Sequence, residues 1–271
     1  MSERPATVLI GAGRMGLAMA KGWLNAKDPP SLTLIDPHPS DAAKALAQHD
    51  NCTLNPPLSD DALGIADRLV LAVKPQVFDA AAPDAKRLLG QGGVVISVMA
   101  GIPLARLQSS LGAERVVRTM PTTPGAVGKG VTLFCLSDAS RQAGDDALAE
   151  ALLSPLGVVE GPIPERLIDA ATTISGCGPA YVFLLTEAMT AAGVKLGLPQ
   201  AMSARLARET VIGSGALMAG DPSSAEDLRK AVTSPGGVTQ AALEVLMKDG
   251  GVPTLMAEAV EAALERARAL S

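Results

Sequence analysis

The segment that decides the fold is Gly11-Ala-Gly-Arg-Met-Gly16, which follows an apolar run at residues 7–10. Glycine at the first position permits a tight turn, and at the second it lets the backbone approach a pyrophosphate. At the third it lets a helix pack closely on a strand, and that helix offers N–H groups and partial positive charge to phosphates. The pattern therefore predicts a dinucleotide-binding strand–turn–helix unit. The alternative is a tight turn without a ligand.

Short β-branched runs alternate with Ala-rich helical segments in the first half of the chain. The predicted strands lie at residues 7–10, 32–35, 68–73, 94–98, 116–119 and 132–135. Helices are predicted at 15–25 and 40–48, where apolar residues recur at helical spacing. Because parallel neighbours need a crossover, this series predicts an α/β fold with a doubly wound, Rossmann-type sheet.

The sequence changes in character after residue 156. Helices are predicted at 180–196, 200–219, 224–232, 238–249 and 252–270, with Gly and Pro between them. We therefore expect a dinucleotide-binding domain at 1–162 and an all-α domain at 163–271. The helices of the second domain are expected to complete their core by oligomerising.

The composition argues against several classes of partner. Aromatic residues make up 2% of the chain and the formal net charge is −5, which disfavours both base stacking and binding to a phosphate backbone. Cys52, Cys135 and Cys177 match neither a disulfide framework nor a zinc pair. His38 and His49 are expected at the surface. We expect no nucleic-acid partner and no metal.

Neither a membrane span nor a targeting peptide is expected. The longest uncharged stretches, 88–105 and 170–186, both contain several glycines and a proline, which favours buried sheet and helix. A strand pattern begins within the first ten residues, where a signal peptide would lie. The expected location is the cytoplasm.

Two charged residues follow predicted strands, at the edge of the sheet where ligands bind in such folds. Asp36 ends the second strand, where a carboxylate accepts hydrogen bonds from an adenosine ribose and repels a 2′-phosphate. Asp36-Pro-His-Pro39 is equally typical of a plain turn, so both interpretations stay open. Lys74 follows the third strand and could contact ribose or phosphate, although most lysines at strand ends are simply solvated.

Two glycine-rich loops precede helices in the second half, Thr233-Ser-Pro-Gly-Gly-Val-Thr239 and Ser175-Gly-Cys-Gly-Pro-Ala180. Successive glycines before a helix expose backbone N–H groups that suit a small carboxylate. The hydroxyls of Ser234 and Thr239 can orient a polar atom of the same ligand. The alternative is a pair of ordinary loops with helix caps.

The sequence lacks the hydrolase signatures HExxH and GxSxG. Reduction of a ketone usually requires a Lys, His or Tyr that moves the hydroxyl proton, and no such residue stands out. An imine differs because its nitrogen can arrive already protonated, so the protein need only align two reactants and stabilise charge. The residues therefore favour a nicotinamide-dependent reductase that acts on an imine.

Five motifs in order along the chain resemble those of the pyrroline-5-carboxylate reductase family. They are GAGRMG at 11–16, AVKP at 72–75, MPTTPG at 120–125, SGCGPAY at 175–181 and LRKAVTSPGGVT at 228–239. The resemblance implies reduction of 1-pyrroline-5-carboxylate to L-proline, the last step of proline biosynthesis, by NADPH or NADH, with the choice of cofactor open. It also implies that the helical domain binds substrate and forms a homodimer, often assembled further into a decamer.

The resemblance also implies particular site residues. The cofactor would lie along Ile10, Gly11, Ala12, Gly13, Arg14, Met15, Asp36, Ser59, Ala72, Val73, Lys74, Pro75, Met99, Ala100 and Gly101. The substrate carboxylate and ring nitrogen would be held by Gly236, Gly237, Val238 and Thr239, with Ser234 close by. Thr239 and Ser234 are the expected catalytic residues. Glu165 corresponds to an acidic residue near the active site of relatives.

Three features depart from the family pattern. Thr122 stands where Asn is usual, Val238 stands where Thr is commoner, and the stretch 221–228 is longer than usual, with Arg229-Lys230 in place of a Lys-Asp pair. None of these changes touches the glycines, so activity is expected to survive them.

Two other functions stay open. A β-hydroxyacid dehydrogenase or another imine reductase would share this architecture, although such dehydrogenases carry a Lys on the long helix, and residues 180–192 contain none. A dinucleotide sensor without catalytic activity would use the helical half for protein contacts, but no basic DNA-reading helix stands out. Turnover of an imino acid would separate the reductase from the sensor.

Overall fold

The computed structural model describes residues 5–57 and 64–270 and divides the chain into two compact units. The sheet unit comprises Met1–Gly176 and Ala267–Ser271, and the helical unit comprises Cys177–Arg266. This division lies later than the boundary expected at 162/163. Helix α7 (Ile168–Ser175) explains the difference, because Ile168 is 1% exposed and belongs to the core of the sheet unit.

The sheet unit is built on an eight-stranded sheet in the order β3-β2-β1-β4-β5-β6-β7-β8. Its strands are β1 (Ala6–Ile10), β2 (Ser31–Ile35), β3 (Cys52–Leu54), β4 (Ala66–Leu71), β5 (Leu89–Ser97), β6 (Val116–Met120), β7 (Gly130–Leu136) and β8 (Gly157–Glu160). All neighbouring pairs are parallel except β6 and β7. The chain order reverses between β1 and β4, which is where open α/β sheets bind ligands.

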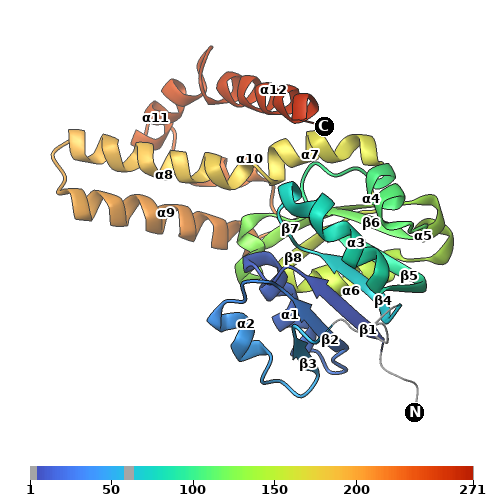
Figure 1. The fold of residues 1–271 in the computed structure, drawn as a ribbon. Coiled ribbons are helices and arrows are strands. Elements are labelled where there is room, and N and C mark those ends of the chain that lie inside the picture. Colours follow the sequence, from blue (N-terminus) through green and yellow to red (C-terminus); the bar gives the residue numbers. More distant parts are fainter. Residues whose placement is uncertain (1–4, 58–63, 271) are drawn as a thin grey trace. The chain divides into compact units, whose positions relative to one another are not determined.

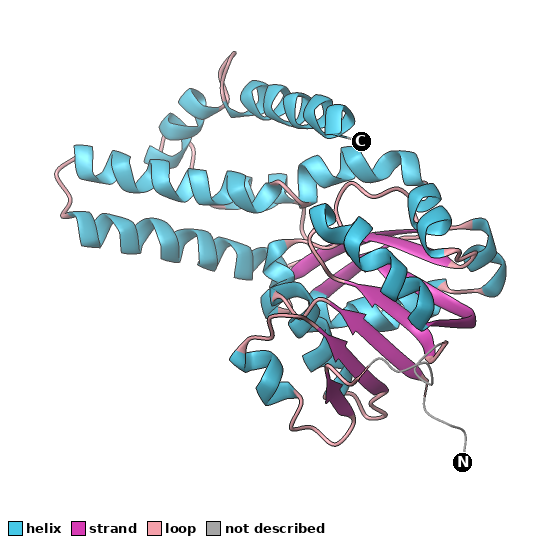
Figure 2. Cartoon of the chain, viewed as in Figure 1, coloured by secondary structure: helices cyan, strands magenta, loops and turns pink. Residues whose placement is uncertain are grey.

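Helices cover both faces of this sheet, as the sequence predicted (Figures 1 and 2). The helices of the sheet unit are α1 (Arg14–Leu24), α2 (Asp41–Leu46), α3 (Phe78–Leu88), α4 (Leu104–Leu111), α5 (Asp138–Ala143), α6 (Asp146–Leu153) and α7. Buried residues of α3 and α4 form one core cluster, and those of α1 and α6 form the other. Strand β1 serves both, since Val8 faces the first cluster and Leu9 the second.

The helical unit contains α8 (Gly178–Lys195), α9 (Gln200–Gly220), α10 (Ala225–Ala231), α11 (Val238–Leu246) and most of α12 (Val252–Leu270). Helices α8 and α9 run side by side as a hairpin (Figure 1). Ser203 of α9 donates a hydrogen bond to the Thr190 carbonyl of α8 at 2.7 Å. Large apolar side chains stay exposed along α8, with Phe183 at 66% and Leu184 at 64%. The five helices confirm those predicted for this half.

One helical stretch, Glu165–Lys195, is long and apolar enough to cross a membrane, by length and composition only. Its mean hydropathy is 1.2, and 11% of its most apolar window is buried. The expectation that 170–186 is buried is therefore wrong for much of that stretch, because α8 exposes its apolar side chains.

Candidate functional site

The glycine loop between β1 and α1 has the geometry that its sequence predicts. Gly11 has φ +98°, and a Cβ at this position would lie 2.6 Å from the carbonyl oxygen of Ala72. A Cβ at Gly16 would clash with the carbonyl oxygen of Gly11, so the third glycine lets α1 approach the loop. A Cβ at Gly13 would meet no atom of the described residues within 4 Å. The backbone of Gly13 thus borders open space, as close approach by a pyrophosphate requires.

A cavity of about 730 Å³ opens beside this loop. Its lining includes Ile10, Gly11, Gly13, Asp36, His38, Asn55, Ala72, Val73, Lys74 and Asp84. These residues come from the ends of β1, β2, β3 and β4 and from α3, at the point where the strand order reverses. The structure therefore brings together many of the cofactor-binding residues implied by the sequence.

Asp36 is held in place by backbone groups on two sides. Its Oδ2 accepts the N–H of Ala12 in the glycine loop at 2.8 Å, and its Oδ1 accepts the N–H of His38 at 2.8 Å. Asn55 exchanges two hydrogen bonds with the backbone of Asp36, at 2.9 and 2.7 Å. The turn that the sequence offered as an alternative is thus present, and the same carboxylate also lines the cavity.

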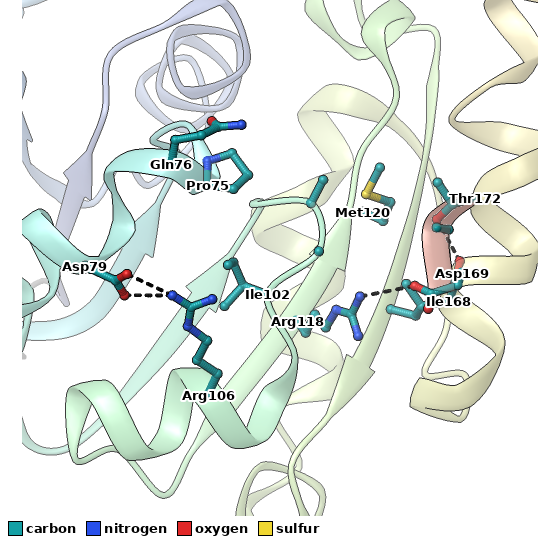
Figure 3. A pocket seen from close by; sticks show the side chains of 13 residues that line it. Pro75, Gln76, Asp79, Ile102, Arg106, Arg118, Met120, Ile168, Asp169 and Thr172 are labelled. Carbon is teal, nitrogen blue, oxygen red and sulfur yellow. Dashed lines mark hydrogen bonds and ion pairs between the residues drawn. The ribbon is translucent and has the colours of Figure 1, made fainter. Parts of the chain in front are cut away.

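A second cavity, of about 520 Å³, is lined mainly by residues that follow β4 and β5 and by residues of β6 and α7 (Figure 3). Pro75, Ala100 and Gly101 line it, together with Met120 and Thr172. Arg106 borders it and forms a two-pronged ion pair with Asp79, with distances of 2.8 and 2.9 Å. This cavity adds Pro75, Ala100 and Gly101 to the expected cofactor residues that border open space.

Arg118 on β6 joins two acidic side chains across the sheet unit. Its guanidinium lies 3.4 Å from Asp169 Oδ1 (Figure 3). It also lies 2.9 Å from Glu165 Oε1, and Arg118 is 7% exposed. Glu165 Oε1 also accepts the N–H of Leu104, the first residue of α4, at 2.8 Å. These contacts fix α4 and α7 to the sheet and give Glu165 a positioning role. A direct substrate contact by Glu165 stays a prediction.

Sequence reasoning missed Arg118. The signal was present, because this residue is the one charge in the predicted strand at 116–119, whose other residues are two valines and a threonine. A charge buried inside a strand requires partners of opposite sign. Those partners lie 47 and 51 positions further along the chain, so spacing alone did not connect them.

Four of the expected cofactor residues, Ala12, Arg14, Met15 and Met99, do not line either of these two cavities. Arg14 borders a separate groove between α1 and α2, and Met15 packs against the core. Ala12 is 4% exposed and Met99 is 1% exposed, so neither offers its side chain to a ligand. Ser59 lies outside the described residues. The prediction of cofactor contacts at these five positions remains untested.

The loop at 234–239 belongs to the helical unit and leads into α11. The N–H of Gly236 donates to Gln240 Oε1 at 2.7 Å, and the N–H of Gly237 donates to the Ser234 carbonyl at 3.0 Å. Within the described ranges, the N–H groups of Val238 and Thr239 make no hydrogen bond. Two of the amides expected to bind a carboxylate are thus engaged inside the unit, and two at the helix N-terminus are open.

The remaining sequence predictions concern Thr122, the histidines and the cysteines. Thr122 is 4% exposed, and its Oγ1 accepts the N–H of Val131 at 2.9 Å, so it anchors the loop before β7. His38 and His49 are both exposed, as predicted. Burial raises the pKa of Cys135 to about 12, which leaves its thiol unreactive. No cluster of His, Cys, Asp or Glu suited to a metal occurs among the described residues.

Comparison with known proteins places this chain in a family. Residues 165–270 match the model described as pyrroline-5-carboxylate reductase dimerisation, and residues 7–101 match that of NADP oxidoreductases, coenzyme F420-dependent. The pyrroline-5-carboxylate reductase of Pisum sativum is 36% identical, and the alignment covers 97% of this chain and 94% of that protein. The one from Synechocystis sp. is 37% identical over 97% of both chains.

Solved structures agree with this relationship. The pyrroline-5-carboxylate reductase of Coxiella burnetii superposes with a TM-score of 0.87 at 31% identity, over 100% of this chain and 99% of that one. The Plasmodium falciparum enzyme, solved with NADP bound, gives 0.74 at 29% identity over 99% and 98%. With a relative more than 30% identical along almost its whole length, this chain belongs to the pyrroline-5-carboxylate reductase family.

Proposed function

We propose that this chain reduces 1-pyrroline-5-carboxylate to L-proline with NADH or NADPH. The observation that carries the proposal is the glycine loop at the switch point of the sheet, open at Gly13, in a chain of this family. The reaction adds a hydride to C5 of the ring C=N bond, and a proton resides on the nitrogen of the product. The bound reduced nicotinamide supplies that hydride.

The residues around the larger cavity fit a dinucleotide. The N-terminus of α1 lacks a side-chain cap at Gly13, so its amides and partial positive charge can face a pyrophosphate. Asp36 is placed to accept hydrogen bonds from a ribose. Pro75, Ala100 and Gly101 line the second cavity and would position the nicotinamide end. These features of the sheet unit support the proposal that it binds a dinucleotide.

The substrate would be held by the loop at 234–239 of the helical unit. The open amides of Val238 and Thr239, at the N-terminus of α11, suit its carboxylate. The hydroxyls of Thr239 and Ser234 would orient the ring nitrogen. Because the substrate nitrogen can arrive protonated, these residues need to position and polarise the iminium rather than donate a proton to it.

The helical unit supports assembly from more than one chain. Exposed apolar side chains such as Phe183 and Leu184 need a covering surface, and this segment matches a dimerisation model. We infer a homodimer, and a decamer and a cytoplasmic location remain predictions. The same pairing would cover the apolar stretch Glu165–Lys195 without a membrane.

The test is oxidation of reduced nicotinamide by the purified protein, followed by absorbance with 1-pyrroline-5-carboxylate as the other substrate. The proposal predicts rapid oxidation with an equal amount of proline formed. Oxidation only with other cyclic imines would move the assignment to a different imine. Nucleotide binding without oxidation of any imine would favour the sensor.

A further inference from the structure

We propose that Asp36 makes this enzyme select NADH over NADPH. The inference rests on the proposed function, since it concerns the cofactor of that reaction. It starts from the position of Asp36 at the end of β2, on the wall of the cavity beside the glycine loop. In this fold that position faces the 2′-hydroxyl of the adenosine ribose, or the 2′-phosphate of NADPH.

The carboxylate of Asp36 has a fixed direction. One oxygen accepts the N–H of Ala12 and the other accepts that of His38, both at 2.8 Å. The backbone on either side is tied to Asn55. To rotate away from a 2′-phosphate, the side chain would have to leave two backbone N–H groups without an acceptor, which costs free energy for each group that is shielded from water. The carboxylate is therefore expected to stay in place when a cofactor binds.

Each oxygen of a carboxylate can accept more than one hydrogen bond, so Asp36 can still accept a ribose hydroxyl while holding its backbone partners. A 2′-phosphate has no proton to share with it and carries close to two negative charges near neutral pH. The same group that binds NADH thus repels NADPH. Discrimination of this kind comes from an unfavourable contact with the rejected ligand as well as a favourable one with the selected ligand.

The surroundings do little to offset this repulsion. Asp84 of α3, which pairs with Arg87 at 3.9 Å, places a second carboxylate on the cavity wall, and no arginine lines this cavity within residues 5–57 and 64–270. Arg14, which follows Gly13 in the glycine loop, borders the separate groove between α1 and α2. Lys74 is the lysine on the cavity wall, and it follows β4 rather than β2. The described lining of this cavity therefore lacks the arginine that usually accommodates a 2′-phosphate.

The experiment is calorimetric titration of the full-length protein with NADH and, separately, with NADPH, in the absence of any imine. We expect NADH to bind at least about tenfold more tightly, which corresponds to about 1.4 kcal/mol. In Asp36→Asn, which removes the charge and keeps an oxygen acceptor, the ratio should fall to about threefold or less. Asp36→Ser is a second variant that removes the charge and keeps a hydroxyl oxygen.

The matched control is Asp138→Asn, which removes an exposed carboxylate at the start of α5, away from both cavities. It should leave the ratio unchanged. Equal affinity of the wild type for the two nucleotides, or tighter binding of NADPH, would overturn the inference and leave the proposed function standing. An unchanged ratio in both Asp36 variants would also overturn it. Binding of neither nucleotide would remove the proposed function, and the inference with it.

Discussion

Arg118 is the residue on which the packing of the sheet unit depends most clearly. Replacing it with Ala leaves Glu165 and Asp169 without their cation. Loss of one partner of a buried ion pair typically costs about 3–5 kcal/mol, but the two carboxylates here are about one-third exposed. We therefore expect Arg118→Ala to destabilise the protein by about 2 kcal/mol, read from the midpoint of thermal unfolding.

The matched control is Lys44→Ala, which removes a lysine that pairs with Asp41 at 3.2 Å on the surface of α2. Its unfolding midpoint should stay close to that of the wild type, because water already screens this pair. Equal midpoints for Arg118→Ala and the wild type would show that the cluster does not fix α4 and α7 to the sheet.

Single residues also mark the limit of prediction from sequence. The position of Asp36 at the end of a strand was predictable from the spacing of the glycine loop and the second strand. The hydrogen bonds of its carboxylate to the Ala12 and His38 amides were not predictable. The Ala12 contact depends on how β1 and β2 pair, which the sequence does not show. The hydrogen bond from the Gly236 amide to Gln240 was not predictable either. A glycine-rich loop before a helix is compatible both with a capped helix end and with amides that are free to bind an anion.

At the scale of elements, the N-termini of α1 and α11 form a matched pair. Each helix has a glycine N-cap in an extended conformation, Gly13 with φ −75° and Gly237 with φ −83°. Neither has a side-chain cap, so both helices present amides and partial positive charge. In our account, the first binds the pyrophosphate and the second binds the substrate carboxylate.

If the two helix N-termini bind different ligands, a glycine-to-valine substitution at each N-cap should impair a different property of the enzyme. Gly13→Val should fold, because its Cβ meets no atom of residues 5–57 and 64–270 within 4 Å, but it should weaken nucleotide binding by at least about tenfold. Gly237→Val pushes a side chain against the Ser234 hydroxyl, so it should lower kcat/KM by about a hundredfold while nucleotide affinity stays near the wild-type value. Calorimetry and steady-state kinetics measure the two quantities separately. If both variants lost nucleotide binding equally, the two helix ends could not serve different ligands.

The elements themselves were partly predictable. The six strands with a clear β-branched pattern are present, while β3 and β8 were missed because they are short strands at the two edges of the sheet. Helices α3, α4, α5, α6 and α7 were not predicted either, and Pro83 lies inside α3. The antiparallel pairing of β6 with β7 follows from a short connection instead of a crossover helix, which local periodicity does not reveal.

At the scale of the whole molecule, the two units differ in how far the single chain buries their apolar side chains. The sheet unit has two buried core clusters and the two cavities of about 520 and 730 Å³, whereas α8 of the helical unit has no buried residue in the single chain. The sequence predicted this contrast through its loss of strand signal after residue 156. The domain boundary was predicted at 162/163, whereas the structure divides the units after Gly176. Ile168 of α7 packs into the core of the sheet unit, and a tertiary contact of this kind is not visible in the sequence.

The central claim is that hydride passes to C5 of 1-pyrroline-5-carboxylate. The most direct test supplies nicotinamide cofactor deuterated at C4 on each face in turn and analyses the proline formed by mass spectrometry and NMR. The account predicts one deuterium per proline, at C5, from one of the two labelled faces. Proline without deuterium from either label, or oxidation of the cofactor without proline, would contradict it.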